Sequence, residues 1–445
     1  MQLIDRLFPS SSSGRLFRLM VFPLLFGFSF LATASDWPQW RGPDRDGTWR
    51  ETGIISWFDA PELQPRWSSP VGAGYSGPTV SGDRVYVTSR LDEPEQVEQI
   101  HCLDRFSGRE IWKHVYPCEY LDLPYPLGPR ASVSVRDGKA YALGAMGHFH
   151  CLDAATGEVL WSKDLVEEYN ANRPWWGITA SPLVDDDNVY LQVGGSPNAC
   201  ILALGKNNGM EQWRSLDGGA SYSAPKFIEQ GGQRLLLVWT AEWFAALDLK
   251  SGQPVWKEKF QRARTIINVA DAVVDAENGR IFLTSFYDGS YLYRLDHENM
   301  GVELLWSRRG PSESNTDALH SIIMTSVIID DHVYGIDSHG EFRCLELGQG
   351  DRVWSEQTLL EKGRWATAFF VRNDDLTWIF TEKGDLVIGR LTPQGFERLS
   401  TTHIIDPTTF LPRRSGNIVW SHPAFAYRHI FVRNDRELIC VDLSQ

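Results

Sequence analysis

A signature of four features recurs along this chain: a small or apolar residue before Leu, then Asp, a Gly in a turn, and a closing Trp. The clear copies end at Trp112, Trp161, Trp213 and Trp256, and weaker copies end at Trp306 and Trp354. Counted from Trp67, successive closing tryptophans are 43 to 52 residues apart. A period of roughly 40–50 residues is the length of one four-stranded propeller blade.

Within each unit the pattern is typical of β-strands. Short apolar runs such as 78–80 and 85–87 are separated by turns rich in Gly, Asp or Asn, which indicates hairpins. No long stretch has apolar residues at a period of 3.6, so few helices are expected. The sequence predicts an all-β protein.

Two further units, at 365–400 and 420–443, lack the full signature, and the last one ends one strand short. Residues 63–70 have the character of a closing strand but follow no blade. We therefore expect them to pair beside 437–443 and to close an eight-bladed β-propeller of four-stranded antiparallel blades. Closure removes free sheet edges.

The chain divides into three predicted parts: a secretory signal peptide at 1–34, an N-terminal entry segment at 35–62 and the propeller at 63–445. The signal peptide is indicated by arginines before an apolar run and by an A-x-A pattern at Ala32–Ala34. An uncleaved anchor remains an alternative. We expect the entry segment to dock on the outside of the ring.

Charge and leader together suggest the compartment and the partners. The formal net charge is -14, which argues against nucleic acid and anionic membrane surfaces. The predicted location is periplasmic or extracellular, without a membrane span after signal cleavage, and a monomer is expected.

Six cysteines in an exported chain raise the question of disulfides. Cys102, Cys151, Cys344 and Cys440 fill the same position in different blades, too far apart to be bridged. They are interpreted as small buried apolar residues. Cys118 and Cys200 fall outside that position, and their state is left open.

Neither a metal site nor a catalytic site is predicted. The run Asp185–Asn188 matches hairpin turns of other blades, where Asx residues are favoured, and calcium binding is the alternative. His148 and His150 could form a metal pair, but no third ligand is evident nearby. The chain lacks G-x-S-x-G, H-E-x-x-H, Walker and C-x-x-C motifs.

The best candidates for ligand contact come from aligning the innermost strands of the blades. Large aromatic and cationic residues precede these strands and would form a ring around the central channel. Such a ring is either a ligand-binding pocket or a plug that fills the channel. The candidate channel-face ligand residues are Tyr75, Arg130, Trp176, Tyr222, His320, Trp365 and Trp420.

The blade signature resembles the pyrroloquinoline-quinone repeat of quinoprotein dehydrogenases and of their non-enzymatic relatives. Residues 36–47 are similar to the entry segment of secreted bacterial quinone-binding-like propellers. The resemblance implies an eight-bladed propeller with tryptophan docking between blades. The resemblance does not extend to the enzyme activity, because quinoprotein dehydrogenases have a pair of adjacent cysteines that this chain lacks. A propeller lipoprotein of the outer-membrane assembly machine is also similar, but no lipid-anchor cysteine follows the apolar run.

Two functions are therefore considered. The first is a secreted or periplasmic, non-catalytic binding or scaffold module for a protein, peptide or glycan, without a cofactor. The second is a divergent oxidoreductase, an alcohol or sugar dehydrogenase that uses pyrroloquinoline quinone with calcium. The Pro- and Tyr-rich insert 116–129 suits partner binding, and a stiff linker is the alternative.

Overall fold

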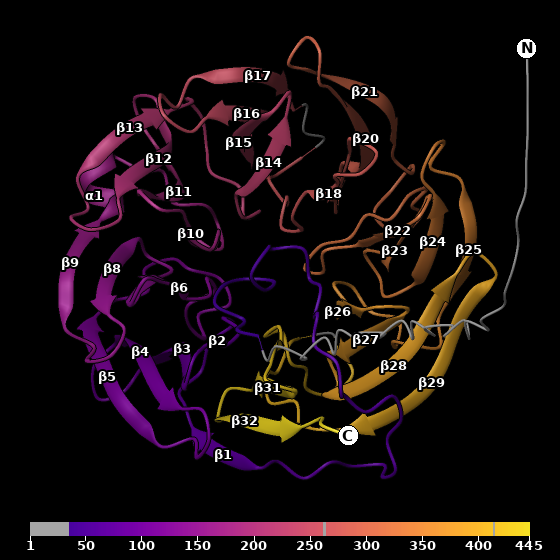
Figure 1. The fold of residues 1–445 in the computed structure, drawn as a ribbon, viewed down its shortest axis with the longest axis horizontal. Coiled ribbons are helices and arrows are strands. Elements are labelled where there is room, and N and C mark those ends of the chain that lie inside the picture. Colours follow the sequence, from indigo (N-terminus) through magenta and orange to yellow (C-terminus); the bar gives the residue numbers. More distant parts are fainter. Residues whose placement is uncertain (1–34, 261–263, 413) are drawn as a thin grey trace, which may run out of the picture. The chain divides into compact units, whose positions relative to one another are not determined.

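A computed structural model describes residues 35–260, 264–412 and 414–445. The predicted signal peptide lies outside these residues. Eight four-stranded antiparallel sheets are arranged as blades in a ring (Figure 1). The one named α-helix, α1 (Leu165–Tyr169), is short, and no described helix is long and apolar enough to cross a membrane. The predicted all-β, eight-bladed propeller is confirmed.

The first four blades follow one another in sequence, each running from the innermost strand to the outermost. Blade 1 consists of β2 (Thr79–Ser81), β3 (Arg84–Leu91), β4 (Val97–Asp104) and β5 (Glu110–Pro117). Blade 2 consists of β6 (Ser134–Arg136), β7 (Lys139–Leu143), β8 (His148–Asp153) and β9 (Val159–Asp164). Blade 3 consists of β10 (Leu183–Val184), β11 (Asn188–Gly195), β12 (Ala199–Gly205) and β13 (Glu211–Ser215). Blade 4 consists of β14 (Lys226–Gln230), β15 (Gln233–Trp239), β16 (Trp243–Asp248) and β17 (Pro254–Lys259).

The remaining blades repeat this order, except that the last one borrows a strand. Blade 5 consists of β18 (Val273–Asp275), β19 (Arg280–Ser285), β20 (Gly289–Asp296) and β21 (Gly301–Arg308). Blade 6 consists of β22 (Val327–Ile329), β23 (His332–Ile336), β24 (Phe342–Glu346) and β25 (Arg352–Glu356). Blade 7 consists of β26 (Ala368–Asn373), β27 (Leu376–Thr381), β28 (Asp385–Thr392) and β29 (Gly395–His403). Blade 8 consists of β30 (Ala424–Ala426), β31 (His429–Arg433), β32 (Glu437–Asp442) and β1 (Trp67–Pro70).

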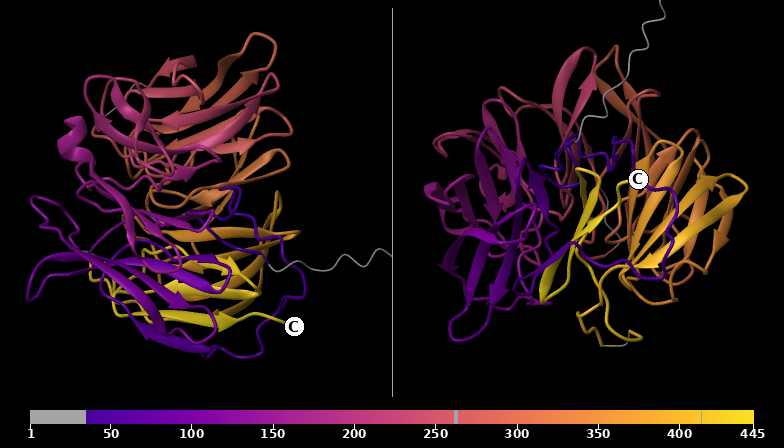
Figure 2. Two further views of the ribbon diagram at one scale, coloured as in Figure 1. Left: turned by 60° about the vertical axis from the view of Figure 1, so that its left-hand side comes forward. Right: turned by 60° about the horizontal axis from the view of Figure 1, so that its bottom comes forward.

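The two ends of the propeller meet in blade 8. Strand β1 pairs antiparallel with β32, with Trp67 opposite Cys440 and Pro70 opposite Glu437. Indigo and yellow segments accordingly lie side by side (Figure 2). This register confirms the predicted closure of the ring by the N-terminal strand.

The recurring signature corresponds to one cross-strand pair between the third and fourth strands of a blade. Cys102 faces Trp112, Cys151 faces Trp161 and Cys344 faces Trp354. The Trp67–Cys440 pair has the same form, although it is made from opposite ends of the chain. A register shift directly follows the pair in blades 1 to 7.

Most closing tryptophans also dock onto the next blade, whereas the Trp256 indole donates to Gln230 of its own blade. The Trp112 indole N–H donates to the Ala154 carbonyl of blade 2, and Trp161 donates to Lys206 of blade 3. The ring lies against the turn glycine of that next blade: a methyl group added at Gly157 would lie 2.6 Å from the Trp112 ring. Gly157 also has φ +77°, so the turn needs glycine for both its conformation and its closeness.

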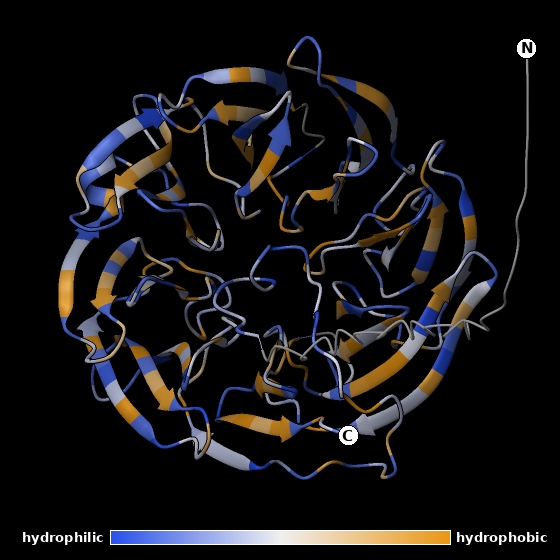
Figure 3. Ribbon diagram, viewed as in Figure 1, coloured by the Kyte–Doolittle hydropathy of each residue, from blue (hydrophilic) through white to orange (hydrophobic). Residues whose placement is uncertain are grey.

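The core follows the second and third strands of the blades. Hydrophobic residues, in orange, dominate strands such as β12 and β32, whereas outer strands such as β5 and β13 are mixed (Figure 3). All six cysteines are buried and free, as predicted for the four in the blade position. Cys118 and Cys200 are free as well.

The expectation that the entry segment docks outside the ring is wrong for its first part. Trp37 pairs with Val80 of β2, and Trp49 N–H donates to the Arg372 carbonyl of β26. Residues 37–49 therefore cross the centre of the propeller, where Figure 1 shows the indigo trace. The tryptophans at the two ends of this segment, Trp37 and Trp49, are buried in the core and are only 2% and 1% exposed.

Arg45 fixes this crossing segment to two further blades. Its guanidinium donates to the carbonyls of Ser181, Pro182 and Pro225, at the entrances to β10 and β14. Arg45 is 2% exposed, and burial lowers its pKa to about 9. One side chain from the entry segment thus satisfies three carbonyl groups at the ring centre, of which Pro182 O also accepts the Ser134 hydroxyl.

The docking contact can be tested with two glycines of blade 2 that have similar φ. Gly157→Ala should lower the free energy of unfolding by about 1–3 kcal/mol more than Gly138→Ala, because only the first adds a clash to the backbone cost. Gly138 has φ +73° and nothing within 4 Å of an added methyl group. Chemical denaturation measures the difference, and equal losses would contradict the docking role.

The central role of the entry segment can be tested with Arg45→Met. It should lower the free energy of unfolding by about 2–4 kcal/mol, since buried carbonyls lose their donor. Arg50→Met is the control, because Arg50 is half-exposed and forms its ion pairs with exposed Asp44 and partly exposed Asp46. Its loss should cost less than about 1 kcal/mol. Similar melting of both variants would show that the segment is peripheral.

Candidate functional site

A cavity of about 160 Å³ lies at one mouth of the central channel. It is lined by residues of the connections that lead from the outer strand of one blade to the inner strand of the next, and Trp40 of the entry segment contributes as well. Since neighbouring strands are antiparallel, these connections share one face of the ring, which we call the connection face. The entry segment closes the channel beneath the cavity.

Six of the seven predicted channel-face residues line this cavity. They are Tyr75, Arg130, Trp176, Tyr222, Trp365 and Trp420. Thr179, at the equivalent register position in blade 3, lines it too. The alignment of the inner strands thus brought together side chains from six different connections. Their role in binding a ligand stays a prediction.

The aromatic rings form a continuous wall. Trp176 lies 5.2 Å from Tyr222 and 5.8 Å from Trp365, measured between ring centroids. Trp365 lies 6.5 Å from Trp420, which in turn lies 6.2 Å from Tyr75. The wall therefore offers ring faces and edges to an apolar or aromatic group.

The polar groups near the floor are already engaged within the protein. The Asp271 carboxylate is 3% exposed and accepts the Trp40 indole N–H and, at 2.8 Å, the Ala224 N–H. His422 Nε2 lies 2.7 Å from Ser132 Oγ. Burial lowers the pKa of His422 to about 3, so this imidazole is neutral above that pH. The floor thus adds little free hydrogen-bonding capacity.

Arg130 holds the insert 116–129 in place. Its guanidinium donates to the carbonyls of Gly128, Pro124 and Tyr125, the last at 2.6 Å. The start of the insert is fixed by the fully buried Glu98, which accepts the hydroxyls of Tyr116 and Tyr120. The insert is therefore a built part of the cavity wall, and Arg130 acts as a positioning residue.

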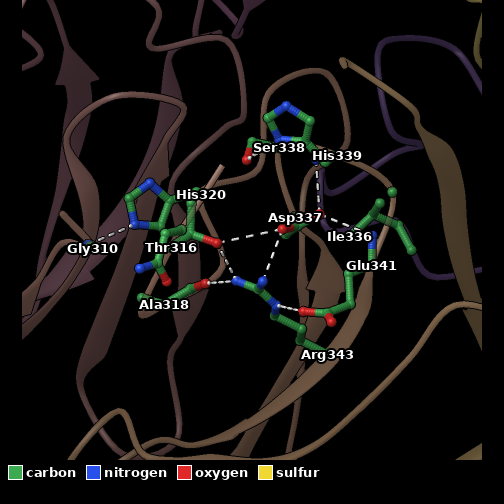
Figure 4. Close-up of polar contacts among 12 residues, drawn as sticks. Gly310, Thr316, Ala318, His320, Ile336, Asp337, Ser338, His339, Glu341 and Arg343 are labelled. Atoms are coloured by element: carbon green, nitrogen blue, oxygen red, sulfur yellow. Dashed lines mark hydrogen bonds and ion pairs between the residues drawn. The ribbon is translucent and has the colours of Figure 1, made fainter. Parts of the chain in front are cut away.

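His320 does not line the cavity. Its Nδ1 lies 3.1 Å from the Phe286 carbonyl, and its Nε2 accepts the Gly310 N–H at 3.3 Å, so the proton resides on Nδ1. Figure 4 shows it beside a buried network in which Arg343 pairs with Asp337 at 2.9 Å. The residues of this connection that line the cavity are Ile322 and Ile323. His320 is only 1% exposed, so its ring is packed inside the connection and does not face the cavity.

The lining also includes residues that the sequence-based set lacked, among them Trp40, Tyr125, Asp271 and His422. Trp40 lies in the entry segment, and Tyr125 lies in an insert absent from other blades. The sequence does show two unusual aromatic segments, the W-P-Q-W-R-G run and the Pro- and Tyr-rich insert. Neither segment belongs to the repeat, so the alignment of blades did not include them. Their arrival at the channel depends on tertiary contacts.

The alternative metal sites can be placed as well. Asp185 accepts the N–H groups of Asp187 and Asn188, the contacts expected of a turn. His148 Nδ1 lies 3.6 Å from Cys118 Sγ. Within the described ranges, no three His, Cys, Asp or Glu side chains converge to hold a metal ion.

With the fold and cavity described, the relatives can be considered. A family model described as outer membrane protein assembly factor BamB matches residues 51–125 and 96–356. The chain belongs to this family. A curated protein with that name from Yersinia pestis is 25% identical over 237 residues, which cover 49% of this chain and 54% of that protein. The chain thus spans about half the length of this relative.

Solved structures agree on the fold. BamB from Moraxella catarrhalis has a TM-score of 0.57 at 15% identity, covering 84% of this chain and 98% of that one. A europium-containing methanol dehydrogenase has a TM-score of 0.61 at 12% identity, covering 89% of each chain. The resemblance to pyrroloquinoline-quinone-repeat propellers is confirmed, and at these identities the likeness extends to the fold alone.

The residues present do not fit a quinone cofactor. The cavity has a volume of about 160 Å³, close to the ~150 Å³ of an engineered cavity that holds one benzene molecule. A tricyclic quinone with carboxylates is larger than benzene. The one guanidinium in the wall is occupied by backbone carbonyls. No redox step is therefore derived for this site.

The positioning role of Arg130 predicts a local effect. Arg130→Gln should make the insert 116–129 at least about tenfold more sensitive to chymotrypsin, because losing charged hydrogen bonds worth ~1.5–3 kcal/mol each raises its open population. Arg90→Lys is a milder control, since Arg90 contacts the insert chiefly through Pro126 O at 2.8 Å and Tyr120. Timed digestion with mass spectrometry identifies the cut sites, and cleavage elsewhere first would contradict the assignment.

Proposed function

We propose that this chain is a periplasmic or extracellular, non-catalytic scaffold that binds a protein partner on its connection face. The observation that carries the proposal is the aromatic cavity, in which the charged groups Arg130 and Asp271 are already hydrogen-bonded within the fold. Of the buried polar atoms in the lining, only the indole N–H groups of Trp365 and Trp420 lack a partner among the described residues. Such a cavity can bind an apolar group, but it offers no free acid, base or nucleophile positioned for chemistry.

Exposed apolar side chains on the same connections support a macromolecular partner. Trp175 is 68% exposed beside Trp176, and Phe410 is 71% exposed in the connection that carries Trp420. Leu121 of the insert is 58% exposed, and its carbonyl accepts Arg173. Aromatic residues are enriched at protein interfaces. The assembly-factor name of the family is in keeping with a protein partner, and a peptide or glycan is the narrower alternative.

Site-specific photo-crosslinking tests this proposal. A photoreactive phenylalanine analogue at Trp175 or Phe410 should give one discrete protein adduct in the periplasm. The matched control is Phe106, which is 51% exposed but lies in the turn between β4 and β5, on the opposite face. Adducts at Phe106 that equal those at the other two positions would overturn the assignment of the face.

The oxidoreductase alternative has its own test. Titration with pyrroloquinoline quinone at micromolar concentration, with and without calcium, should give no saturable absorbance change and no calorimetric heat. The cavity is too small for the group and has no unoccupied guanidinium for its carboxylates. Stoichiometric binding would replace the scaffold proposal by a cofactor-dependent function.

A further inference from the structure

An aromatic side chain of the protein itself already occupies the mouth of the cavity. The Tyr125 ring lies 5.8 Å from Trp365, 5.8 Å from Trp420 and 6.5 Å from Trp176, measured between centroids. These three tryptophans, which we call the tryptophan box, come from three different connections. The box therefore binds an aromatic ring that is presented by a separate segment of chain.

The backbone of Tyr125 is strained in this position. Its φ is +56°, a left-handed conformation that non-glycine residues rarely adopt. Pro126 follows, and a residue before proline favours extended backbone, so the conformation is unfavourable for a second reason. Strain of this kind is concentrated at ligand-binding sites. An extended segment from another molecule would present its ring without this strain.

Release of the Tyr125 ring does not require the insert to unfold. The backbone is fixed by Arg130 at the Tyr125 carbonyl and by Arg90 at the Pro126 carbonyl, 2.8 Å away. The Tyr125 side chain is only partly buried, and no described residue accepts its hydroxyl. Rotation about χ1 moves the ring out of the box while the insert stays in place.

The charge and the volume of the site limit which group can replace the Tyr125 ring in the box. The box presents mainly ring carbons, and the buried indole N–H groups of Trp365 and Trp420 have no described acceptor. The His422 ring below it is neutral, and the Arg130 guanidinium is committed to carbonyls. The cavity beneath Tyr125 adds about 160 Å³, the scale of one aromatic ring. The chain's own example of a ligand is the sequence Leu-Pro-Tyr-Pro-Leu at 123–127.

We propose that the tryptophan box is a receptor for an uncharged aromatic side chain on an extended, proline-flanked segment of the partner, with Tyr125 as the resident competitor that this segment displaces. The inference rests on the proposed function, since it names the chemistry of the partner at the same cavity. Intramolecular occupancy benefits from a high effective concentration, so Tyr125 sets a threshold that the partner must exceed.

A capped pentapeptide, acetyl-Leu-Pro-Tyr-Pro-Leu-amide, tests the proposal by calorimetry and tryptophan fluorescence on the full chain. It should bind saturably, whereas the same peptide with alanine in place of tyrosine should not. The Tyr125→Ala variant should bind the tyrosine peptide about tenfold more tightly than the natural protein does. Tyr125→Phe is the matched control, because it keeps the ring, and its affinity should be unchanged.

The outcomes separate the two proposals. Weaker binding by Tyr125→Ala, with unchanged melting, would show that Tyr125 is a wall of the site and would overturn the competitor role. Equal binding of both peptides, or of neither, would overturn the aromatic receptor. In both cases, crosslinks confined to the connection face would leave the scaffold proposal standing, and their absence would remove it independently.

Discussion

The contact between a closing tryptophan and the glycine turn of the next blade is the interaction on which the propeller depends. A blade of four short strands has two faces to bury, and only its neighbours can cover them. The indole supplies area, and its N–H fixes the register between blades, as Trp112 does with Ala154. A side chain on the turn glycine would push the two blades apart, since the ring lies where the methyl group would be. The contact therefore sets the angle between blades, and through it the width of the channel.

That channel is closed by a segment that belongs to no blade. Residues 37–49 pair with β2 at one end and with β26 at the other, and Arg45 bonds the entrances of β10 and β14 in between. The segment also places Trp40 in the lining of the cavity. One piece of chain thus both bonds the ring centre and contributes to the cavity. This arrangement links stability and recognition in the same side chains.

The parts of the structure that repeat could be predicted, and the parts that occur once could not. Register relative to the inner strands placed Tyr75, Arg130 and Tyr222 at the cavity, because every blade enters the channel in the same way. His320 failed this rule because its ring is buried against Phe286 and Gly310, and Ile322 and Ile323 reach the cavity from the same connection. Trp40 and Tyr125 come from non-repeated segments, whose positions are set by long-range hydrogen bonds that leave no periodic trace. Composition predicted partner binding for the insert without showing where the insert would lie.

The pairing of β1 with β32 also orders the events of folding. The residues made first find their sheet partners only when those made last are present, because Trp67 lies opposite Cys440. Contacts of such long sequence separation form slowly, and blade 8 keeps an unpaired edge until they do. A partly synthesised chain therefore holds seven assembled blades at most. Protection of that edge by a holding chaperone, or rapid completion of the chain, becomes part of what this architecture demands of the cell.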